Sequence, residues 1–213
     1  MSAPSNVLVL GTRNAKKQRE LEILLRGTGI EPVSLSHYPN AIEVDETGTT
    51  FAENARLKAA QQAVALGQWV LGEDSGLCVD ALGGAPGVIS ARFSGPDATD
   101  AKNNALLMEK LAGISTEGRS AHYVCHACLA DPSGAIRIDV EAICRGRIVD
   151  EALGSGGFGY DPYFEIPEYH RTFAELGDAV KSMISHRARA MRSFLAELKK
   201  LVVDGHWPDT VSG

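Results

Sequence analysis

Two adjacent carboxylates, Glu73 and Asp74, are the side chains in this sequence with the clearest potential for chemistry. They follow the apolar run at residues 69–71 and precede Ser75 and Gly76. Neighbouring carboxylates repel each other, and hard oxygen donors of this kind are typical ligands of magnesium. The pattern predicts a strand that ends in an acidic turn open to a ligand. The alternative is a plain solvated turn, because Asp, Ser and Gly are ordinary turn residues.

A basic turn near the N-terminus is the second candidate site. It joins an apolar strand at residues 7–10 to a helix predicted at residues 15–26. The start of a helix presents backbone N–H groups and the positive end of the helix dipole, which suits phosphate. The side chains that would add donors or positive charge there are Thr12, Arg13, Asn14, Lys16 and Lys17. The Walker spacing is absent, and the alternative is a plain strand-to-helix connection.

A second helix is predicted to begin after Thr50 and to end at Gly67. Thr50 and Glu53 have the S/T-x-x-E spacing of a capping box, which gives Glu53 a structural role. The functional alternative makes Glu53 a third carboxylate near the acidic pair. Lys58 lies a little over one turn further along the same helix and is a candidate phosphate ligand.

Two later segments carry groups that could contact a nucleobase. Residues 154–162 contain four glycines and two aromatic residues, and flat rings on a flexible backbone can stack on a base. The alternative is a surface loop whose rings pack into the core. Ser185 is a predicted N-cap of a final helix that runs to about residue 202, which places His186 and Arg187 in its first turn. That turn is either an anion site or a solvated helix start.

Composition limits the class of protein. The chain has 213 residues, 44% of them apolar and 23% charged, which is typical of a globular domain with an ordinary core. A formal net charge of −6 argues against a broad nucleic-acid-binding surface. No apolar run approaches the ~20 residues of a membrane helix, and residues 1–6 do not resemble a secretory signal. We therefore expect a cytoplasmic protein without nucleic-acid or membrane partners.

The cysteine pattern includes Cys125 and Cys128 in C-x-x-C spacing. They lie in a predicted strand, residues 119–130, that pairs with a second strand at residues 135–149 through a turn. Residues three apart on a strand face opposite sides, and no second C-x-x-C is present to complete a zinc site. We interpret both as reduced core cysteines rather than a redox or zinc motif.

Together these features favour an α/β protein that acts on a nucleoside polyphosphate with magnesium. From about residue 7 to residue 198, the sequence resembles the inosine/xanthosine triphosphate pyrophosphatase family. The motifs that carry the resemblance are T-R-N-A-K-K at residues 12–17, T-F-A-E-N at 50–54, E-D-S-G-L at 73–77, G-A-P-G-V at 84–88, F-G-Y-D at 158–161 and S-H-R at 185–187. Many bacterial members carry Asp-Asp where this chain has Glu73-Asp74, and others carry Glu-Asp.

The resemblance implies hydrolysis of ITP, dITP and XTP to the monophosphate and pyrophosphate, with Mg²⁺ as cofactor. It also implies a homodimer. Length and composition predict one domain spanning residues 1–213, with a polar tail from about residue 204. The implied fold is an elongated, two-lobed mixed α/β sheet flanked by helices, with the active-site cleft between the lobes.

Site roles follow from the resemblance and from the side-chain chemistry. Asp74 would be the general base and a metal ligand, with Glu73 or Glu53 as a further ligand. The predicted substrate-binding residues are Thr12, Arg13, Asn14, Ala15, Lys16, Lys17, Lys58, Ser75, Phe158, Gly159, Tyr160, Asp161, Lys181, His186 and Arg187. Two other functions stay open, namely a pyrophosphatase for different nucleotides and a nucleotide-binding module without catalysis.

Overall fold

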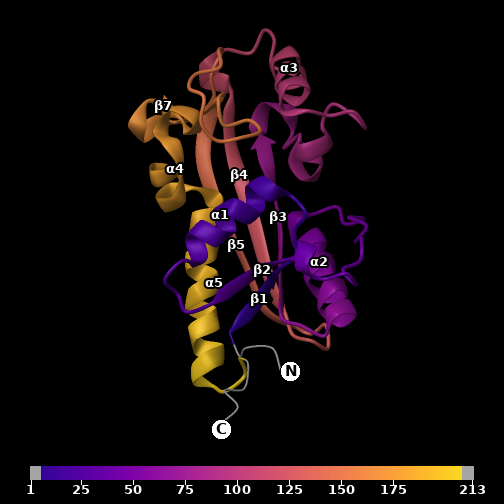
Figure 1. The fold of residues 1–213 in the computed structure, drawn as a ribbon. Coiled ribbons are helices and arrows are strands. Elements are labelled where there is room, and N and C mark those ends of the chain that lie inside the picture. The colour runs from indigo at the N-terminus through magenta and orange to yellow at the C-terminus, as the bar shows by residue number, and fades with distance from the viewer. Residues whose placement is uncertain (1–5, 208–213) are drawn as a thin grey trace. The chain divides into compact units, whose positions relative to one another are not determined.

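The computed structural model describes residues 6–207. The N-terminal residues 1–5 and the last part of the predicted polar tail, residues 208–213, lie outside the described part. Along the chain (Figure 1), the helices and strands are β1 (Val7–Leu10), α1 (Ala15–Leu25), β2 (Glu31–Ser34), α2 (Phe51–Leu66), β3 (Val70–Val79), α3 (Asp100–Lys110), β4 (Ser120–Ala130), β5 (Ile136–Ile148), β6 (Phe164–Ile166), β7 (Arg171–Thr172), α4 (Phe173–Ile184) and α5 (His186–Val203).

One mixed sheet contains all seven of these strands, in the order β2-β1-β3-β4-β5-β6-β7. Strand β1 runs parallel to β2 and to β3, whereas β6 is antiparallel to β5 and to β7. Parallel pairing at one end and antiparallel pairing at the other confirm the predicted mixed α/β class.

The chain divides into two compact units. The first contains Met1–Asp74, His126–Glu141 and Arg189–Gly213, and the second contains Ser75–Cys125 and Ala142–Ala188. The strands β3, β4 and β5 contribute residues to both. Each unit is described below by itself.

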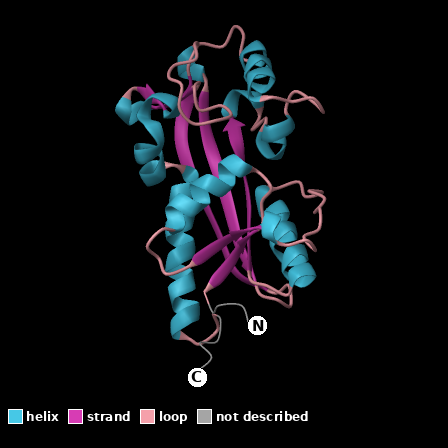
Figure 2. Ribbon diagram, in the orientation of Figure 1, coloured by secondary structure: helices cyan, strands magenta, loops and turns pink. Residues whose placement is uncertain are grey.

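The first unit has helices on both faces of its strands (Figure 2). Because side chains alternate along a strand, Leu8 and Leu10 of β1 face one cluster and Val9 faces the other. Helices α1 and α5 fill the first cluster, and the alanines of α2 fill the second. Beyond α5, Trp207 is 7% exposed, and its ring centroid lies 4.7 Å from that of Trp69.

The second unit has one aromatic-rich core. Tyr123 of β4, Phe164 of β6 and Phe173 of α4 pack together, with ring centroids 4.7 Å apart for the first pair and 5.3 Å for Phe164 and Phe173. Leucines from α3 and from β3 complete this cluster. The core therefore fixes β3, β4 and α4, which carry several of the predicted site residues.

Two features differ from the sequence prediction. Strand β3 does not end at the acidic pair but continues to Val79, because Leu77 and Val79 provide a second buried apolar run. Helix α4 was not predicted, although Thr172 and Glu175 form a capping box at its start. Gly177 interrupts it with a φ of 72°, which obscures the helical period in the sequence.

Several element predictions are confirmed. Helix α2 begins with the Thr50–Glu53 capping box and ends at Gly67 in a left-handed conformation. The two long strands β4 and β5 and the start of α5 at His186 also match the prediction. Among residues 6–207, no helix is both long enough and apolar enough to cross a membrane.

Candidate active site

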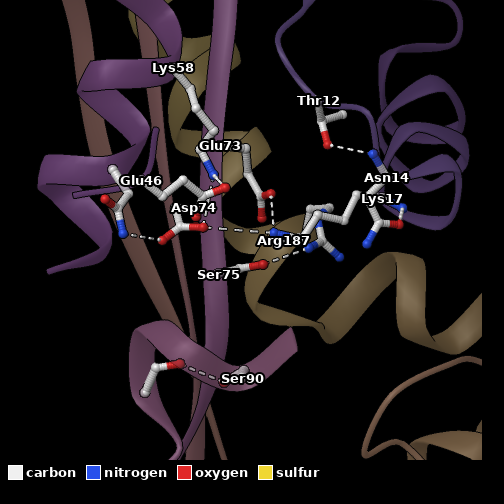
Figure 3. A network of polar contacts seen from close by, with 12 residues as sticks. Thr12, Asn14, Lys17, Glu46, Lys58, Glu73, Asp74, Ser75, Ser90 and Arg187 are labelled. Carbon is white, nitrogen blue, oxygen red and sulfur yellow. Dashed lines mark hydrogen bonds and ion pairs between the residues drawn. The ribbon is translucent and has the colours of Figure 1, made fainter. Parts of the chain in front are cut away.

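The acidic pair lies in the middle of β3, and both carboxylates are buried. Glu73 is 1% exposed and Asp74 is 4% exposed. The ammonium nitrogen of Lys58 lies 2.9 Å from Oδ1 of Asp74 (Figure 3). The ammonium nitrogen of Lys17 lies 3.1 Å from Oε2 of Glu73 and 4.0 Å from Oδ1 of Asp74. These contacts form a buried network of alternating charge.

Close packing of α2 on β3 positions the Lys58–Asp74 pair. A Cβ atom at Gly72 would lie 2.3 Å from the carbonyl oxygen of Ala55 and 2.5 Å from the backbone nitrogen of Ala59. Only glycine allows the helix backbone to approach the strand this closely. Lys58 precedes Ala59 on α2, and Asp74 lies two residues beyond Gly72, so the approach brings the two charges together.

Burial and neighbouring charges shift both pKa values of this pair. Burial raises the pKa of Asp74 above its ordinary value, although Lys58 and Lys17 partly offset this. Burial alone would lower the pKa of Lys58, but the negative charges of Asp74 and Glu46 outweigh it, and the pKa is raised. Lys58 therefore stays protonated at neutral pH, and the Asp74 carboxylate is a stronger proton acceptor than that of a free aspartate.

Glu46 is a carboxylate at this site that the sequence reasoning missed. Its Oε1 lies 3.4 Å from the ammonium nitrogen of Lys58, so Lys58 bridges Glu46 and Asp74. Glu46 lies in an irregular segment before α2, where no periodicity marks it. Asn54 was also missed as a site residue, and its amide nitrogen lies 3.4 Å from Oδ2 of Asp74.

Glu53 has the structural contacts that its capping box predicts. Its Oε2 accepts hydrogen bonds from the backbone nitrogens of Thr49 and Thr50, at 2.7 and 3.2 Å, and from the Thr49 hydroxyl at 3.0 Å. These hydrogen bonds lower the pKa of Glu53. Its role as a metal ligand stays a prediction, and Glu46 is the carboxylate seen beside Lys58.

The basic turn before α1 uses its polar side chains for capping. Oδ1 of Asn14 accepts hydrogen bonds from the backbone nitrogens of Lys16 and Lys17, at 3.0 and 3.1 Å, and the Thr12 hydroxyl accepts one from Asn14 at 3.2 Å. Arg13 donates to the carbonyls of residues 41 and 42, at 3.2 and 3.3 Å. Of the predicted phosphate ligands on α1, Lys17 is therefore the one seen at the acidic pair, whereas Ala15 and Lys16 are exposed.

In the second unit, Lys181, Asp161 and Phe158 form a separate group. The ammonium nitrogen of Lys181 lies 2.6 Å from Oδ2 of Asp161 and 4.4 Å from the centroid of the Phe158 ring. That carboxylate oxygen also accepts the backbone N–H of Phe158 at 2.8 Å. The group holds a buried cation against the face of an aromatic ring.

Contacts of the residues immediately before and after Phe158 hold the glycine-rich segment. A Cβ at Gly157 would lie 2.1 Å from Oδ2 of Asp161, so glycine is required there. Gly159 accepts a hydrogen bond from Asn104 at 2.9 Å and donates one to Asp100 at 3.0 Å. Tyr160 is 4% exposed, and its hydroxyl donates to the Ser90 carbonyl at 2.8 Å. Tyr160 therefore follows the alternative prediction, with its ring in the core.

The start of α5 is buried rather than solvated. The His186 ring stacks on Tyr123, with centroids 4.6 Å apart and an interplanar angle of 10°. Arg187 is 1% exposed and donates a hydrogen bond of 2.8 Å to the hydroxyl of Ser75 (Figure 3). Burying an arginine is costly unless polar partners compensate it, which favours a functional role over the solvated alternative.

Comparisons with known proteins cover nearly the whole chain. The family model described as the Ham1 family matches residues 8–197. A dITP/XTP pyrophosphatase of Rhodopirellula baltica is 52% identical over 195 residues, which are 92% of this chain and 94% of that protein. One of an Exiguobacterium species is 51% identical over 191 residues, 90% of this chain and 96% of that protein. The solved structure of a HAM1 protein from Coxiella burnetii has a TM-score of 0.83 and 36% identity, covering 91% of this chain and 98% of the other. The chain therefore belongs to the Ham1 family.

Proposed function

We propose that this chain is a nucleoside-triphosphate pyrophosphatase that hydrolyses dITP, ITP and XTP to the monophosphate and pyrophosphate. The relatives named dITP/XTP pyrophosphatase support this substrate class. The observation that carries the proposal is the pairing of the buried carboxylates Glu73 and Asp74 with Lys17 and Lys58. A mainly structural role would not need three buried charges and the half-buried Lys17 on three neighbouring elements.

The carboxylates of this network fit a divalent cation. Glu46, Glu73 and Asp74 provide hard oxygen donors, and with Lys17 and Lys58 they leave one net negative charge. We assign Asp74 and Glu73 as ligands of Mg²⁺, with Glu46 as a further candidate beside the predicted Glu53. When bound, Mg²⁺ would offset phosphate charge and acidify the attacking water.

Asp74 acts as the general base in this proposal. Its carboxylate accepts a proton from the water that attacks the α-phosphorus, and pyrophosphate leaves. The raised pKa of Asp74 brings its basicity closer to neutral pH, where proton transfer is more effective. Lys17 and Lys58 move from their carboxylate partners to phosphate oxygens when the substrate and metal arrive, so their charge is preserved.

The Phe158–Lys181 group recognises the base in this proposal. The Phe158 ring stacks on the purine, and Lys181, His186 or Arg187 donates to the 6-oxo oxygen. Adenine carries a 6-amino donor at that position, so donors would face donors. A buried polar mismatch of this kind discriminates by about 10⁴–10⁵-fold. Ser75 would contact a phosphate or sugar oxygen.

The test is an assay of the purified protein with Mg²⁺ against dITP, ITP, XTP, GTP and ATP, with pyrophosphate and orthophosphate detected separately. We expect pyrophosphate from the first three and little product from ATP or GTP. Orthophosphate instead would place the attack at the terminal phosphate and contradict the role given to Asp74. Tight binding without any product would favour the non-catalytic module, and turnover of pyrimidine nucleotides would favour the other pyrophosphatase.

Three further predictions from the sequence accompany this function. A homodimer is expected, and light scattering on the eluting protein measures its mass directly. A cytoplasmic location is expected, and fractionation of cells that produce the protein tests it. One cooperative domain is expected, and it predicts a single thermal unfolding transition.

A further inference from the structure

A second cluster of metal-binding side chains lies in the first unit, on β4 and β5. It consists of His126, Cys128 and Asp139, and we call it the hairpin donor cluster. One nitrogen of His126, the sulfur of Cys128 and one carboxylate oxygen of Asp139 all lie within 4.8 Å of one another. None of these residues belongs to the charged network around Asp74.

Strand alternation places these three donors on one side of the hairpin. Ala127, Leu129 and Ile138 are their immediate chain neighbours, and all three belong to the apolar cluster under α1 and α5. Cys128 belongs instead to the cluster under α2. Cys125 lies three residues before Cys128 on the same strand, and residues three apart face opposite sides. The donor set therefore excludes Cys125 and is not a C-x-x-C motif.

The surroundings of His126 resemble the outer contacts of a metal-bound histidine. The imidazole is buried and contacts a carboxylate at each ring nitrogen, with Asp139 at Nε2 and Glu141 Oε2 at 3.3 Å from Nδ1. A histidine that ligates a metal through one nitrogen commonly contacts a carboxylate through the other. Glu141 provides that second contact here.

Asp139 is ionised and held in place. Burial would raise its pKa, but hydrogen bonds from Arg56 and His126 outweigh this and lower it. The Arg56 side chain donates to Oδ2 at 2.6 Å, which leaves Oδ1 facing His126. Arg56 of α2 thus holds Oδ2 in place. Oδ1 contacts only His126 among these groups, and it is the oxygen that can bind a metal ion instead.

Cys128 is unsuited to act alone as a nucleophile. Burial, and next the charge of Asp139, raises the pKa of its thiol to about 12. A thiol of this kind is neither a ready nucleophile nor a redox centre. A metal ion changes this, because coordination deprotonates the thiol.

We propose that the hairpin donor cluster binds a zinc-like divalent transition-metal ion through His126, Cys128 and Asp139. Nitrogen, thiolate and carboxylate donors together suit zinc and disfavour magnesium. In a tetrahedral site such donors lie about 3.3–3.8 Å apart. The ion would therefore replace the direct His126–Asp139 hydrogen bond, and these two side chains must separate slightly to admit it. Binding releases the Cys128 proton to solvent and forms a metal–sulfur bond, without any change in redox state. The proton on Nε2 of His126 moves to Nδ1, where Glu141 accepts its hydrogen bond, and Nε2 becomes free to bind the ion. The bound ion joins β4 to β5 and lies outside the catalytic network.

The test is a titration of the chelator-treated full chain with Co²⁺, followed by competition with Zn²⁺. We expect a thiolate-to-cobalt charge-transfer band in the near ultraviolet, displaced by Zn²⁺ and unaffected by excess Mg²⁺. Calorimetry in two buffers of different ionisation enthalpy should show about one proton released per ion, with affinity rising with pH.

Matched cysteine variants assign the sulfur. Cys125→Ala should keep the band, and Cys128→Ala should lose it. Asp139→Asn, at a partly exposed position, should weaken binding by about 10- to 100-fold and serves if Cys128→Ala does not fold. A band that survives in Cys128→Ala, or is absent from the parent protein, would overturn the proposal. Loss in Cys125→Ala alone would do so too, and none of these results depends on the pyrophosphatase activity.

Discussion

Two buried lysine–carboxylate pairs lie in the two units, and their surroundings differ. In the first unit, the Lys58–Asp74 pair is 2.9 Å long and has the charges of Glu46, Glu73 and Lys17 around it. In the second unit, the Lys181–Asp161 pair is 2.6 Å long, and its cation lies over the Phe158 and Phe173 rings at 4.4 and 5.8 Å.

These different surroundings suit the two pairs to different tasks. Several exchangeable charges can be redistributed among a metal ion, phosphates and a water molecule. A single cation fixed against an aromatic face instead defines the position of a flat polar ring and the direction of one donor. We therefore assign turnover to the first pair and base selection to the second.

The largest expected effect is on turnover. Asp74→Asn removes the proposed general base while keeping the size of the side chain, and we expect kcat to fall by about 10²–10⁴-fold. Nucleotide binding, measured by calorimetry, should persist. Glu43→Gln, an exposed carboxylate of the same unit, is the control and should keep its rate. If Asp74→Asn lost nucleotide binding and turnover together, the assignment of turnover to the Lys58–Asp74 pair would be contradicted.

The next effect is on stability. In the second unit, Asp161→Asn removes the carboxylate charge from buried Lys181, and breaking such a pair costs about 3–5 kcal/mol of unfolding free energy. Asp74→Asn leaves Lys58 in contact with Glu46, so without metal it should cost less than about 2 kcal/mol. Denaturant unfolding of the metal-free variants measures both values. Equal losses would show that the surroundings of the pairs do not matter.

A smaller effect is expected from the ring. Phe158→Ala should weaken binding of ITP by about 1–3 kcal/mol through loss of stacking, mainly as a higher KM. Phe158→Leu keeps an apolar side chain but has no ring to stack on the base. It should therefore restore only part of the ITP binding that Phe158→Ala loses. Steady-state kinetics of both variants, with the exposed Tyr169→Ala as control, separate stacking from simple burial. An unchanged KM in both would exclude the ring from base binding.

The smallest effect is a pH dependence that separates two carboxylates of the first unit. The pKa of Asp74 is raised above the ordinary aspartate value of 3.8. Without metal, the contribution of Asp74 to stability is therefore lost as the pH rises above 3.8 and through the raised pKa. Asp74→Asn should therefore gain stability relative to the parent as pH increases. Glu53 has a lowered pKa, so its contribution is lost as the pH falls below 4.5. Glu53→Gln should thus lose stability relative to the parent as pH increases, and slopes of the same sign would contradict the assignment.

Local signals in the sequence predicted much of the fold. The capping box at Thr50 and the N-cap at Ser185 fixed the starts of α2 and α5, because these signals act within one helical turn. The sequence predicted that the helix carrying Lys58 lies near the acidic pair, but it did not predict the direct contact between Lys58 and Asp74. The close approach at Gly72 that creates it depends on which helix packs on which strand.

Other features could not be predicted from local pattern. Glu46 lies in an irregular segment, and its contact with Lys58 comes from the path of that segment. Asp139 joins His126 and Cys128 only through strand pairing, so no local pattern indicates that the three side chains lie together. Helix α4 does have a local signal, the Thr172–Glu175 capping box, but Gly177 interrupts the helical period that would follow it.

The division between turnover and base selection can be tested with two lysine variants and one quantity, the ratio of kcat/KM for ITP to that for ATP. Lys17→Met, in the first unit, should lower both values together and leave the ratio unchanged. Lys181→Met, in the second unit, should lower the ratio by at least about tenfold, because it removes a proposed donor to the 6-oxo group. A ratio that changes in Lys17→Met and stays constant in Lys181→Met would contradict the division between turnover and base selection.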